Sequence, residues 1–484
     1  MYIALSPAYS VRNEASASFL IRVDKIIDNG ISGYSTFCIP PFMGYILSHI
    51  SDDEYPQSVE NISKALKVSS EAIEKFVQQI IDADANKKFI VSEKQYIILP
   101  SDLLIKCSEK PKPLIYEDAD FDGLGDFVVT RPSVPTNANL MVTTKCTTDC
   151  LYCYANRKIN PDMKTEKILD LVRELHDQGT INVTLTGGDI FAHPDWREIL
   201  KCVREYGYQP FLSTKTPINY EQIQYLKDLG YEEIQFSLDS DDPNILKKLI
   251  RVNNGYLDKV ASFLTHCSEL KLKVLVRSVL TKLNASKDRI TSLYSFLTKY
   301  DCVKEWVMTP AFFSEYKRSE YKSLEINNDD MIWVYQFSKR EDLSFKIGLN
   351  KISKDGYALK RFDNTEEYVC YNQICLANTI GISILANGLC SVCEMLYENP
   401  EYVLGDVNKS TVKEIWNSEK ALDLYHMKQQ HVPQSSPCSE CAVFEKCRNG
   451  FGKRICYLDI AKIGHSKFEP DPRCPHSENI DLVL

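Results

Sequence analysis

The stretch that decides the fold is TTKCTTDCLYCYA, residues 143–155. It places three thiols within eight residues, at Cys146, Cys150 and Cys153, in the spacing C-x3-C-x2-C. A structural zinc site takes four ligands, usually from two CxxC pairs or from CxxC with HxxxH. Within the thirty residues after Cys153, the only Cys or His is His176, in the middle of a helix-like segment. Three thiolates instead suit an iron–sulfur cluster that keeps one iron open for a substrate or cofactor.

The overall composition is that of an ordinary globular protein. The chain has 484 residues, of which 44% are hydrophobic and 25% charged, which allows two to four domains. The net charge of -9 argues against a dedicated surface for nucleic acid or anionic membranes. The first residues lack a basic region followed by an apolar core, and no apolar run is long enough to cross a membrane. We therefore expect a cytoplasmic protein.

The cysteines are numerous and unevenly distributed. There are 17, and clustered cysteines in a reducing compartment more often bind metal or do chemistry than form disulfides. Nine of them lie in the segment from Cys370 to Cys474. The single cysteines are expected to be small buried hydrophobes; they are Cys38, Cys107, Cys202, Cys267 and Cys302.

Helix-like and strand-like segments alternate after the three cysteines. Residues 163–179, MKTEKILDLVRELHDQG, carry apolar side chains at helical spacing, and INVTLTGGD, residues 181–189, has the pattern of a buried strand. With residues 139–144 as the first strand, six strand–helix units follow one another, which predicts an α/β fold with a partial (β/α)6 TIM-like barrel. Chemistry in such barrels lies at the C-terminal ends of the strands. The cysteines after strand one and TGGD at the end of strand two should therefore open onto the same mouth.

Residues 135–350 resemble a radical SAM core on these motifs. The resemblance implies that Cys146, Cys150 and Cys153 hold a [4Fe–4S] cluster whose fourth iron is chelated by S-adenosylmethionine (SAM). The segment Gly187–Gly188–Asp189 would then contact the amino end of SAM, with glycine allowing a close approach of the backbone. The family usually has Glu at the third position, so Asp189 is a departure; a turn with a helix cap is the alternative.

Two further sequence matches to this family are weaker. Ser237, in FSLDS, would face the ribose or sulfonium end of SAM together with Asp239, and Arg251, in IRVNNG, would approach the SAM carboxylate. The alternatives are an ordinary strand end for Ser237 and a solvated charge for Arg251.

The C-terminal cysteines, in residues 365–484, resemble a SPASM domain, which binds two auxiliary iron–sulfur clusters in enzymes that modify peptides and proteins. The resemblance implies a nearer cluster on Cys370, Cys375, Cys393 and Cys456. It implies a farther cluster on Cys438, Cys441, Cys447 and Cys474.

This segment also departs from the family pattern. Phe451 stands where the family usually has a cysteine, so Cys456 is expected to substitute, and an open iron in the nearer cluster is the alternative. Cys390 competes with Cys393 as a ligand, and a zinc ribbon is the alternative for CSECAVFEKC, residues 438–447. Glu394, directly after Cys393, resembles the acid that serves as a base in sulfatase-maturing relatives. An exposed loop carboxylate is its alternative.

The N-terminal segment, residues 1–107, has the pattern of a winged helix. Three short amphipathic helices are expected near residues 42–50, 59–68 and 70–83, followed by a hairpin at 87–100, with two more strands upstream. This resembles the recognition element related to the PQQ-pathway chaperone, which takes a leader peptide as an extra strand. A DNA-binding winged helix is the alternative, disfavoured by the acidic third helix. Residues 108–134 read as a linker.

These resemblances together imply a maturase of a ribosomally made precursor peptide. SAM and three [4Fe–4S] clusters would be its cofactors, with a flavodoxin- or ferredoxin-type electron donor. A 5'-deoxyadenosyl radical would remove a hydrogen atom from the peptide, and a thioether or carbon–carbon crosslink would follow. The alternatives are a protein-modifying oxidase of the formylglycine type and a non-enzymatic iron–sulfur regulator.

Overall fold

The structure is a computed structural model that describes residues 1–23, 27–28, 31–32, 36–81, 83–92, 95–156, 161–311, 323–357, 362–370, 375, 377–397, 399–449 and 455–478. Phe451, where the family pattern expects a cysteine, lies outside the described residues. The chain divides into two compact units. The N-terminal unit comprises Met1–Asp28, Ser32–Thr136 and His176–Asn182, and the main unit comprises the rest of the chain.

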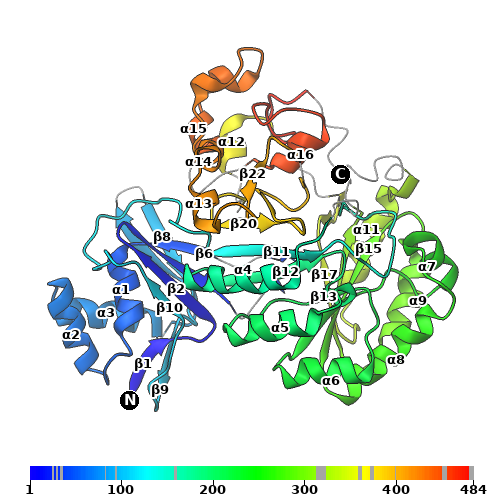
Figure 1. Cartoon of the computed structure of the whole chain (residues 1–484), viewed down its shortest axis with the longest axis horizontal. Helices are drawn as coiled ribbons and strands as arrows, with labels where there is room; N and C mark the ends of the chain where they lie inside the picture. Colours follow the sequence, from blue (N-terminus) through cyan, green and yellow to red (C-terminus); the bar gives the residue numbers. More distant parts are fainter. Residues whose placement is uncertain are drawn as a thin grey trace. The chain divides into compact units, whose positions relative to one another are not determined.

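A four-stranded sheet forms the centre of the N-terminal unit, in the order β10-β2-β3-β6 (Figure 1). Its strands are β2 (Tyr9–Glu14), β3 (Ala17–Arg22), β6 (Thr36–Ile39) and β10 (Ile115–Glu117). Three two-stranded pairs accompany it: β1 (Tyr2–Leu5) with β9 (Leu104–Cys107), β4 (Ile27–Asp28) with β5 (Ile31–Ser32), and β7 (Lys87–Ser92) with β8 (Gln95–Leu99). The sequence pattern predicts β3, β6 and the β7–β8 hairpin, and the structure contains all four strands.

The three expected helices are present as α1 (Pro41–His49), α2 (Gln57–Leu66) and α3 (Ser70–Ile81). Helix α3 buries Ile73, Phe76, Val77 and Ile80, the i, i+3, i+4, i+7 spacing that places side chains on one face. Phe76 packs on Phe89 of β7, with ring centroids 5.3 Å apart. One face of the β7–β8 hairpin is thereby covered by α3.

The opposite face of the β7–β8 hairpin is apolar and exposed. Ile90 is 79% exposed, Tyr96 56% and Ile98 45%. The register pairs Ile90 with Tyr96 and Lys88 with Ile98, so these apolar side chains lie on the same side of the two strands. Among the described strands, neither β7 nor β8 pairs with a further strand. The hairpin therefore offers unpaired edges and an exposed, mostly apolar face, on which Lys88 Nζ lies 3.9 Å from the centroid of the Tyr96 ring.

The segment predicted as a linker, residues 108–134, contains strand β10. It pairs in parallel with β2, where Ile115 lies opposite Val11. Side chains strengthen this attachment, because Arg12 pairs with Asp118 at 2.9 Å. Part of the expected linker is thus folded into the N-terminal unit.

Two five-stranded sheets organise the main unit, in the orders β12-β11-β20-β21-β22 and β13-β14-β15-β16-β17. The strands of the predicted core are β11 (Asn137–Thr143), β12 (Asn182–Gly187), β13 (Ser213–Thr214), β14 (Glu233–Ser237), β15 (Lys273–Leu280), β16 (Val303–Pro310) and β17 (Lys346–Leu349). The pairs from β13 to β17 are all parallel. The six predicted strand–helix units are therefore present, and β17 extends the second sheet.

Helices follow the strands and lie on their outer side (Figure 1). They are α4 (Thr165–Asp177), α5 (Trp196–Glu205), α6 (Tyr220–Asp228), α7 (Pro243–Ile250), α8 (Tyr256–Glu269), α9 (Lys287–Leu297) and α11 (Asn328–Ser338), with the short 3-10 helix η1 (Ile190–Ala192) after β12. The side chains of strand β15 alternate between the hydrophobic core and a cavity. Val274, Val276 and Leu280 are buried in the core, whereas Arg277 and Val279 line a cavity on the other side.

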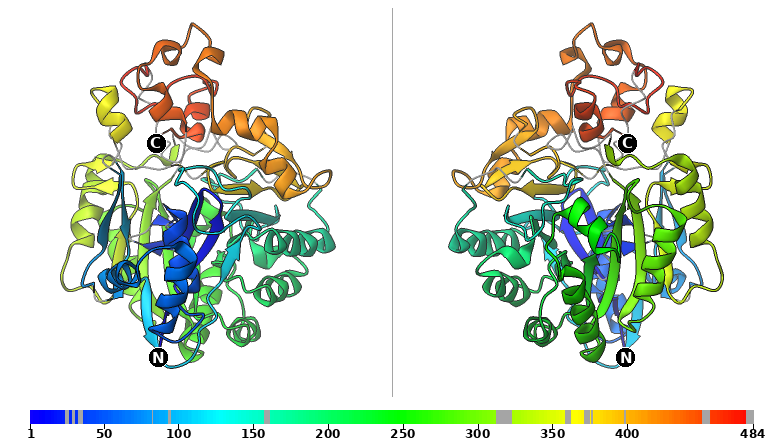
Figure 2. Two further views of the ribbon diagram at one scale, coloured as in Figure 1. Left: turned by 90° about the vertical axis from the view of Figure 1, so that its left-hand side faces the viewer. Right: turned by 90° about the vertical axis from the view of Figure 1, so that its right-hand side faces the viewer.

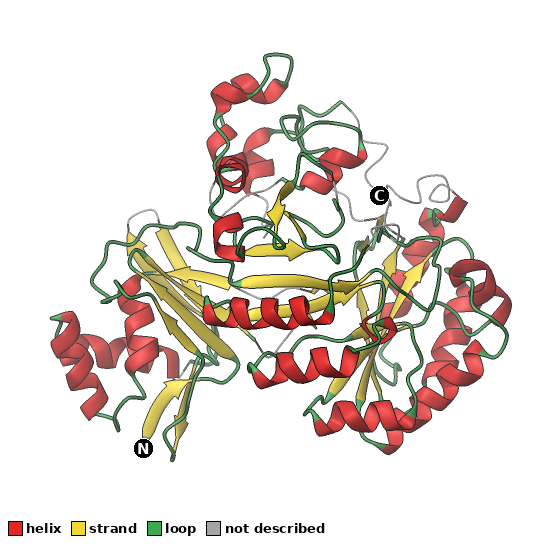
Figure 3. Ribbon diagram, in the orientation of Figure 1, coloured by secondary structure: helices red, strands yellow, loops and turns green. Residues whose placement is uncertain are grey.

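The C-terminal residues form short strands followed by helices and loops (Figures 2 and 3). The elements are β18 (Ile352–Ser353), β19 (Gly356–Tyr357), α12 (Thr365–Cys370), β20 (Gly381–Ile384), β21 (Leu389–Ser391), β22 (Val403–Asp406), α13 (Val412–Trp416), α14 (Glu419–Tyr425), η3 (Gln429–His431), η4 (Pro437–Glu440), α15 (Phe444–Arg448) and α16 (Tyr457–Lys462). Strand β20 pairs in parallel with β11, from Asn137 opposite Gly381 to Leu140 opposite Ile384. Strands β20–β22 thus continue the sheet of the first barrel strand. None of the described helices is both long and apolar enough to cross a membrane.

Candidate functional site

A cavity of about 300 Å³ lies at the C-terminal ends of the core strands. The side chains that line it come from the cysteine loop after β11 and from β12 to β16. They include Cys146, Cys150, Cys153, Tyr154, Thr186, Gly187, Gly188, Asp189, Lys215, Ser237, Arg277 and Thr309. The structure therefore brings the three cysteines and the glycine–acid segment to one mouth, as the strand–helix pattern predicts.

The cysteine loop is held from two sides. The amides of Asp149 and Leu151 donate to the carbonyls of Ile250 and Leu249 at the end of α7, at 3.0 and 2.9 Å. A turn from Cys150 O to Cys153 N, 3.1 Å, brings the second and third cysteines together. Burial raises the pKa of Cys150 to about 11. Such a thiol gives up its proton when it ligates a positively charged group.

The two glycines are required by the protein's own backbone. A Cβ on Gly187 would lie 2.4 Å from Thr143 O, and one on Gly188 would lie 2.1 Å from Lys145 O. Gly187 also has φ of +150°. The amide of Gly188 donates to Thr143 O at 2.8 Å. These contacts place the end of β12 directly against the start of the cysteine loop. The glycines therefore allow close packing within the protein, in addition to the close approach to a ligand that the sequence motif predicts.

Asp189 is occupied by bonds within the protein. One oxygen accepts from Phe191 N at 3.0 Å and so caps η1. The other accepts from Thr214 Oγ1 at 2.7 Å, Lys215 N at 3.1 Å, Thr216 N at 3.3 Å and Thr216 Oγ1 at 2.9 Å. The side chain is buried, and its carboxylate joins the ends of β12 and β13.

A buried ion pair lies close to the cysteines. Lys215 Nζ donates to Asp239 Oδ2 at 2.9 Å, and the Tyr152 hydroxyl donates to the same oxygen. Burial acts to lower the pKa of Lys215, but Asp239 and the cysteines Cys150 and Cys146 outweigh it and raise the pKa overall. Lys215 therefore stays charged beside the thiols. Asp239, predicted to face SAM, is instead held by these two side chains.

Of the two weaker candidates, Ser237 lies at the cavity and Arg251 does not. Ser237 lines the cavity, and its hydroxyl accepts from Gln235 Nε2 at 2.8 Å. Arg251 is not among the residues that line it: the side chain is 52% exposed, and Nη1 lies 2.5 Å from Asp149 Oδ2. Its contact with the cysteine loop is thus an ion pair on the outside of the cavity.

Two polar atoms in the cavity have no partner within the described part of the chain. They are Arg277 Nη2 on β15 and Thr309 Oγ1 on the adjacent strand β16, and both are buried. Burial lowers the pKa of Arg277, and an unpaired buried donor is costly unless a ligand or water satisfies it. These residues are available to a bound molecule. The sequence signal was a cation, Arg277, in the interior of the otherwise apolar strand that begins at Lys273.

Glu394, from the C-terminal segment, contacts two residues that line this cavity but is not itself among the lining residues. Its carboxylate accepts from Asn139 Nδ2 of β11 at 2.6 Å, Tyr154 Oη at 3.1 Å and Thr186 Oγ1 of β12 at 3.2 Å. Tyr154 and Thr186 line the cavity. Glu394 and burial both raise the pKa of Tyr154, which stays a hydrogen-bond donor. The carboxylate is therefore a fixed acceptor behind two residues of the cavity wall and not an exposed loop charge.

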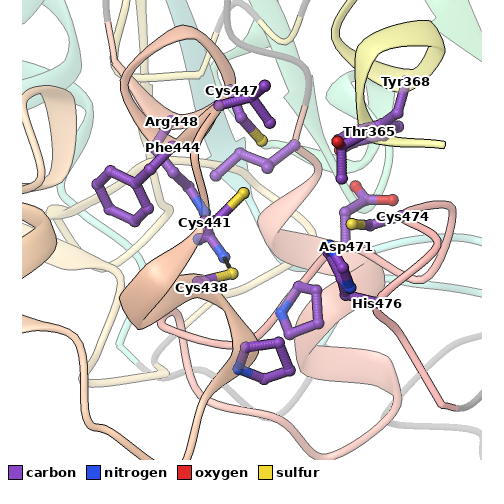
Figure 4. Close-up of a pocket in the computed structure, with 14 residues that line it drawn as sticks. Thr365, Tyr368, Cys438, Cys441, Phe444, Cys447, Arg448, Asp471, Cys474 and His476 are labelled. Carbon is purple, nitrogen blue, oxygen red and sulfur yellow. Dashed lines mark hydrogen bonds between the residues drawn. The ribbon is translucent and has the colours of Figure 1, made fainter.

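The four cysteines predicted for the farther cluster lie around one cavity (Figure 4). Cys438, Cys441, Cys447 and Cys474 line it together with Arg448 and Asp471. No three His, Cys, Asp or Glu side chains in the described ranges converge closely enough to hold a single metal ion. The four cysteines instead share the lining of one small cavity of about 20 Å³.

Of the remaining predicted ligands, Cys375 lies near Cys393 and Cys456. Burial raises the pKa of Cys393 to about 12, with Cys375 among its electrostatic neighbours, and Cys375 likewise contributes, after burial and Asp459, to the raised pKa of Cys456. Cys375 is thus close to both. Cys370 is exposed, and its sulfur is 3.8 Å from Lys446 Nζ.

Cys390, the competitor of Cys393, lies elsewhere. It is 0% exposed in strand β21, packed in the hydrophobic core. Burial is the main cause that raises its pKa, followed by Asp406, and no cysteine is among the causes.

Comparison with known proteins agrees with this geometry. Residues 140–290 match the model of the radical SAM superfamily, and residues 375–442 match that of SPASM, an iron–sulfur cluster-binding domain. The probable GTP 3',8-cyclase of Pyrococcus abyssi is 27% identical over 176 residues, which are 36% of this chain and 56% of that protein. The chain spans about half the length of the curated relatives it matches.

Two solved structures of Streptococcus suis SuiB match nearly the whole chain. SuiB bound to the precursor peptide SuiA is 14% identical and has a TM-score of 0.63. SuiB bound to S-adenosylmethionine is 13% identical and has a TM-score of 0.62. Each match covers 98% of this chain and 99% of the other, so the likeness establishes a shared fold. The chain thus carries a segment that matches the radical SAM superfamily and a segment that matches the SPASM iron–sulfur domain, and it has the fold of SuiB.

Proposed function

We propose that this enzyme is a maturase of a ribosomally made precursor peptide and that it installs a thioether or carbon–carbon crosslink. The observation that carries the proposal is the single cavity onto which Cys146, Cys150, Cys153 and the Gly187–Gly188 segment open. SuiB, which has this fold, has been crystallised bound to S-adenosylmethionine in one structure and bound to its precursor peptide in another.

The residues around the cavity suit the cofactors that this function needs. Cys146, Cys150 and Cys153 supply three thiolates for a [4Fe–4S] cluster, and the cavity beside them is large enough for a small ligand. When bound, that cluster and SAM supply a 5'-deoxyadenosyl radical that removes a hydrogen atom from an unactivated carbon.

The chain's own residues position and shield the reactants. Lys215, charged and paired with Asp239, places a positive charge beside the thiolates. Gly187, Gly188 and Ser237 line the space that we assign to SAM. The walls of the cavity are strand side chains and backbone, which exclude bulk water from the reacting atoms.

Glu394 is proposed as the base that accepts a proton from the substrate. Its Tyr154, Thr186 and Asn139 contacts fix the carboxylate in place, as a positioned acceptor requires. Arg277 and Thr309 provide unpaired donors to a carbonyl or carboxylate of the bound peptide. Arg251 is not assigned a role in the cavity, because it pairs with Asp149 outside it.

We further propose two auxiliary [4Fe–4S] clusters, which makes three in all. Cys438, Cys441, Cys447 and Cys474 would hold the farther one. Cys370, Cys375 and Cys393 would hold the nearer one, with Cys456 as its fourth ligand or an open iron in its place. A flavodoxin- or ferredoxin-type donor would supply electrons from outside.

The leader of the precursor is proposed to bind the β7–β8 hairpin. A peptide strand added to a free edge gains main-chain hydrogen bonds, and apolar pockets select its side chains. The hairpin has unpaired edges among the described strands and the bare side chains Ile90, Tyr96 and Ile98.

The function is tested with the reconstituted enzyme, SAM, dithionite and synthetic copies of the short peptides encoded beside its gene. We expect one peptide to lose two hydrogens, with tandem mass spectra that lack fragments between the joined residues. An aldehyde that reacts with hydrazide, with all fragments present, would indicate the formylglycine-type alternative. SAM cleavage without any change in a peptide would reject the maturase.

Changing the hairpin should weaken leader binding. The double variant Ile90→Asp/Ile98→Asp removes two apolar contacts, each worth roughly 1.5–3 kcal/mol, so we expect the dissociation constant to rise about 100-fold. Fluorescence anisotropy with a labelled leader measures it. Leu422→Asp, which changes an exposed apolar residue of α14 in the main unit, is the control. Equal affinity of wild type for peptides with and without the leader would contradict this binding mode.

Cys456→Ala should damage the nearer cluster alone. We expect iron to fall by at most about one cubane, and crosslinking to fall while SAM cleavage persists. Mössbauer and EPR spectra measure the change, and Cys390→Ala, in the hydrophobic core, is the matched control. Spectra identical to wild type would show that Cys456 is no ligand and support the open-iron alternative.

A further inference from the structure

A buried arginine lies beside the farther auxiliary site without a carboxylate partner. Arg448, the last residue of α15, is 1% exposed. Its Nη1 donates to Lys467 O at 2.6 Å, and its Nη2 donates to Glu469 O and, at 3.2 Å, to the sulfur of Cys438 (Figure 4). No carboxylate oxygen in the described part of the chain forms an ion pair with it. Two neutral carbonyls and one sulfur are therefore its hydrogen-bond acceptors.

A buried positive charge needs a negative counterpart. Moving an unpaired guanidinium out of water costs several kcal/mol, and proteins pair such charges or place them beside bound anions. Four thiolates around an iron–sulfur cluster are such an anion. The position of Arg448 is therefore explained when Cys438 and its neighbours hold a cluster.

The second buried arginine of this region, Arg473, has different partners from Arg448. It donates to Asp471, with Nε 2.7 Å from Oδ1 and Nη2 2.6 Å from Oδ2, and Asp459 lies 3.6 Å away. The Asp471 carboxylate also accepts from the amide of Cys456 at 2.8 Å. Arg473 is thus neutralised by carboxylates, whereas no carboxylate in the described residues pairs with Arg448, although Asp471 also lines the cavity of Cys438.

We propose that Arg448 raises the reduction potential of the cluster held by Cys438, Cys441, Cys447 and Cys474, so that this cluster accepts an electron more readily than it would without the arginine. Hydrogen bonds to the sulfurs and net charge are two of the factors that set such potentials. An N–H bond to the Cys438 sulfur and a buried positive charge both stabilise the reduced, more negative cluster. Arg448 acts through the ligand and is a tuning residue. This inference rests on the auxiliary clusters of the proposed function.

The knuckle that carries Cys438 is rigid enough to hold this contact. Gln429 Nε2 donates to the carbonyls of Cys438 and Cys441, at 3.1 and 3.0 Å. The Ser436 hydroxyl accepts from Cys438 N at 3.2 Å and donates to Phe468 O at 2.9 Å. The loop that contains Phe468 also supplies the two carbonyls that fix Arg448, so sulfur and guanidinium are anchored to the same segment.

The test is an EPR-monitored redox titration of the reconstituted full chain. The Cys146/Cys150/Cys153→Ala background removes the signal of the core cluster, so that the auxiliary signals are read alone. We expect Arg448→Gln to keep its iron and to shift the midpoint of one auxiliary cluster to a more negative potential, while the other stays in place. Arg448→Lys, which keeps the charge but loses the planar fork, should give a smaller shift in the same direction. Arg340→Gln, at an exposed arginine, should shift neither midpoint.

The outcomes separate this inference from the proposed function. Two auxiliary signals with unmoved midpoints in both Arg448 variants would overturn the tuning role and leave the clusters standing. If the background protein gave no auxiliary signal at all, the auxiliary clusters themselves would be rejected. If Arg448→Gln does not retain iron, the lysine variant decides: a wild-type midpoint there overturns the inference.

Discussion

Replacing Cys146, Cys150 and Cys153 together by Ala is expected to abolish formation of 5'-deoxyadenosine and to leave iron on the protein. These thiols are the cysteines that line the 300 Å³ cavity, and without them no cluster reaches SAM. The auxiliary cysteines belong to other segments and keep their iron. Chromatographic assay of deoxyadenosine under dithionite, with iron analysis, measures both. Cys202→Ala, on helix α5, should behave as wild type, and a triple variant that still cleaves SAM would end the radical SAM interpretation.

Asp189→Ala should be the most damaging single substitution among those discussed. Its carboxylate accepts five hydrogen bonds from Phe191, Thr214, Lys215 and Thr216. Each buried donor left unsatisfied costs about 1–3 kcal/mol, a large part of a typical folding free energy. We expect the thermal midpoint to fall by more than about 10 °C and SAM cleavage to be lost.

A matched control distinguishes this network from ordinary helix capping. Asp242 caps α7 through Asn244 N at 2.8 Å and forms a partly exposed ion pair with Arg289 at 2.6 Å, so Asp242→Ala should cost only about 1–2 kcal/mol. Differential scanning calorimetry compares the two. If the losses were equal, Asp189 would be no more than a cap.

Local patterns in the sequence predicted much of this protein because they depend on near neighbours. Cysteine spacing within eight residues marks a cluster loop, and apolar spacing marks α3 and α4. Their buried faces, Ile73–Ile80 and Ile168–Leu175, follow the pattern. The alternation of strands and helices then places Cys146 and Gly187 at one mouth, since parallel strands share a C-terminal edge.

Contacts between distant segments carry no such signal. Glu394 meets Asn139 across 255 positions of sequence, and nothing local marks that encounter. Arg251 was expected at SAM because of its place in a motif, yet Asp149 pairs with it outside the cavity. Asp189 lies at the end of β12, but its carboxylate accepts hydrogen bonds from within the protein. This occurs because the short strand β13 ends beside it and presents the donors of Thr214, Lys215 and Thr216.

The pairing of β20 with β11 bears on how such enzymes diversify. Domains joined by a linker can be exchanged as modules, but here the cluster-bearing segment continues the sheet of the first barrel strand. A chimera that imported a foreign C-terminal half would have to reproduce that register as well as its cysteines. One cut before β20 would leave β11 with an open hydrophobic edge, which is a template for aggregation. Evolution of new chemistry on this scaffold is therefore expected to proceed by changes within loops and cavity walls, with the two halves inherited together.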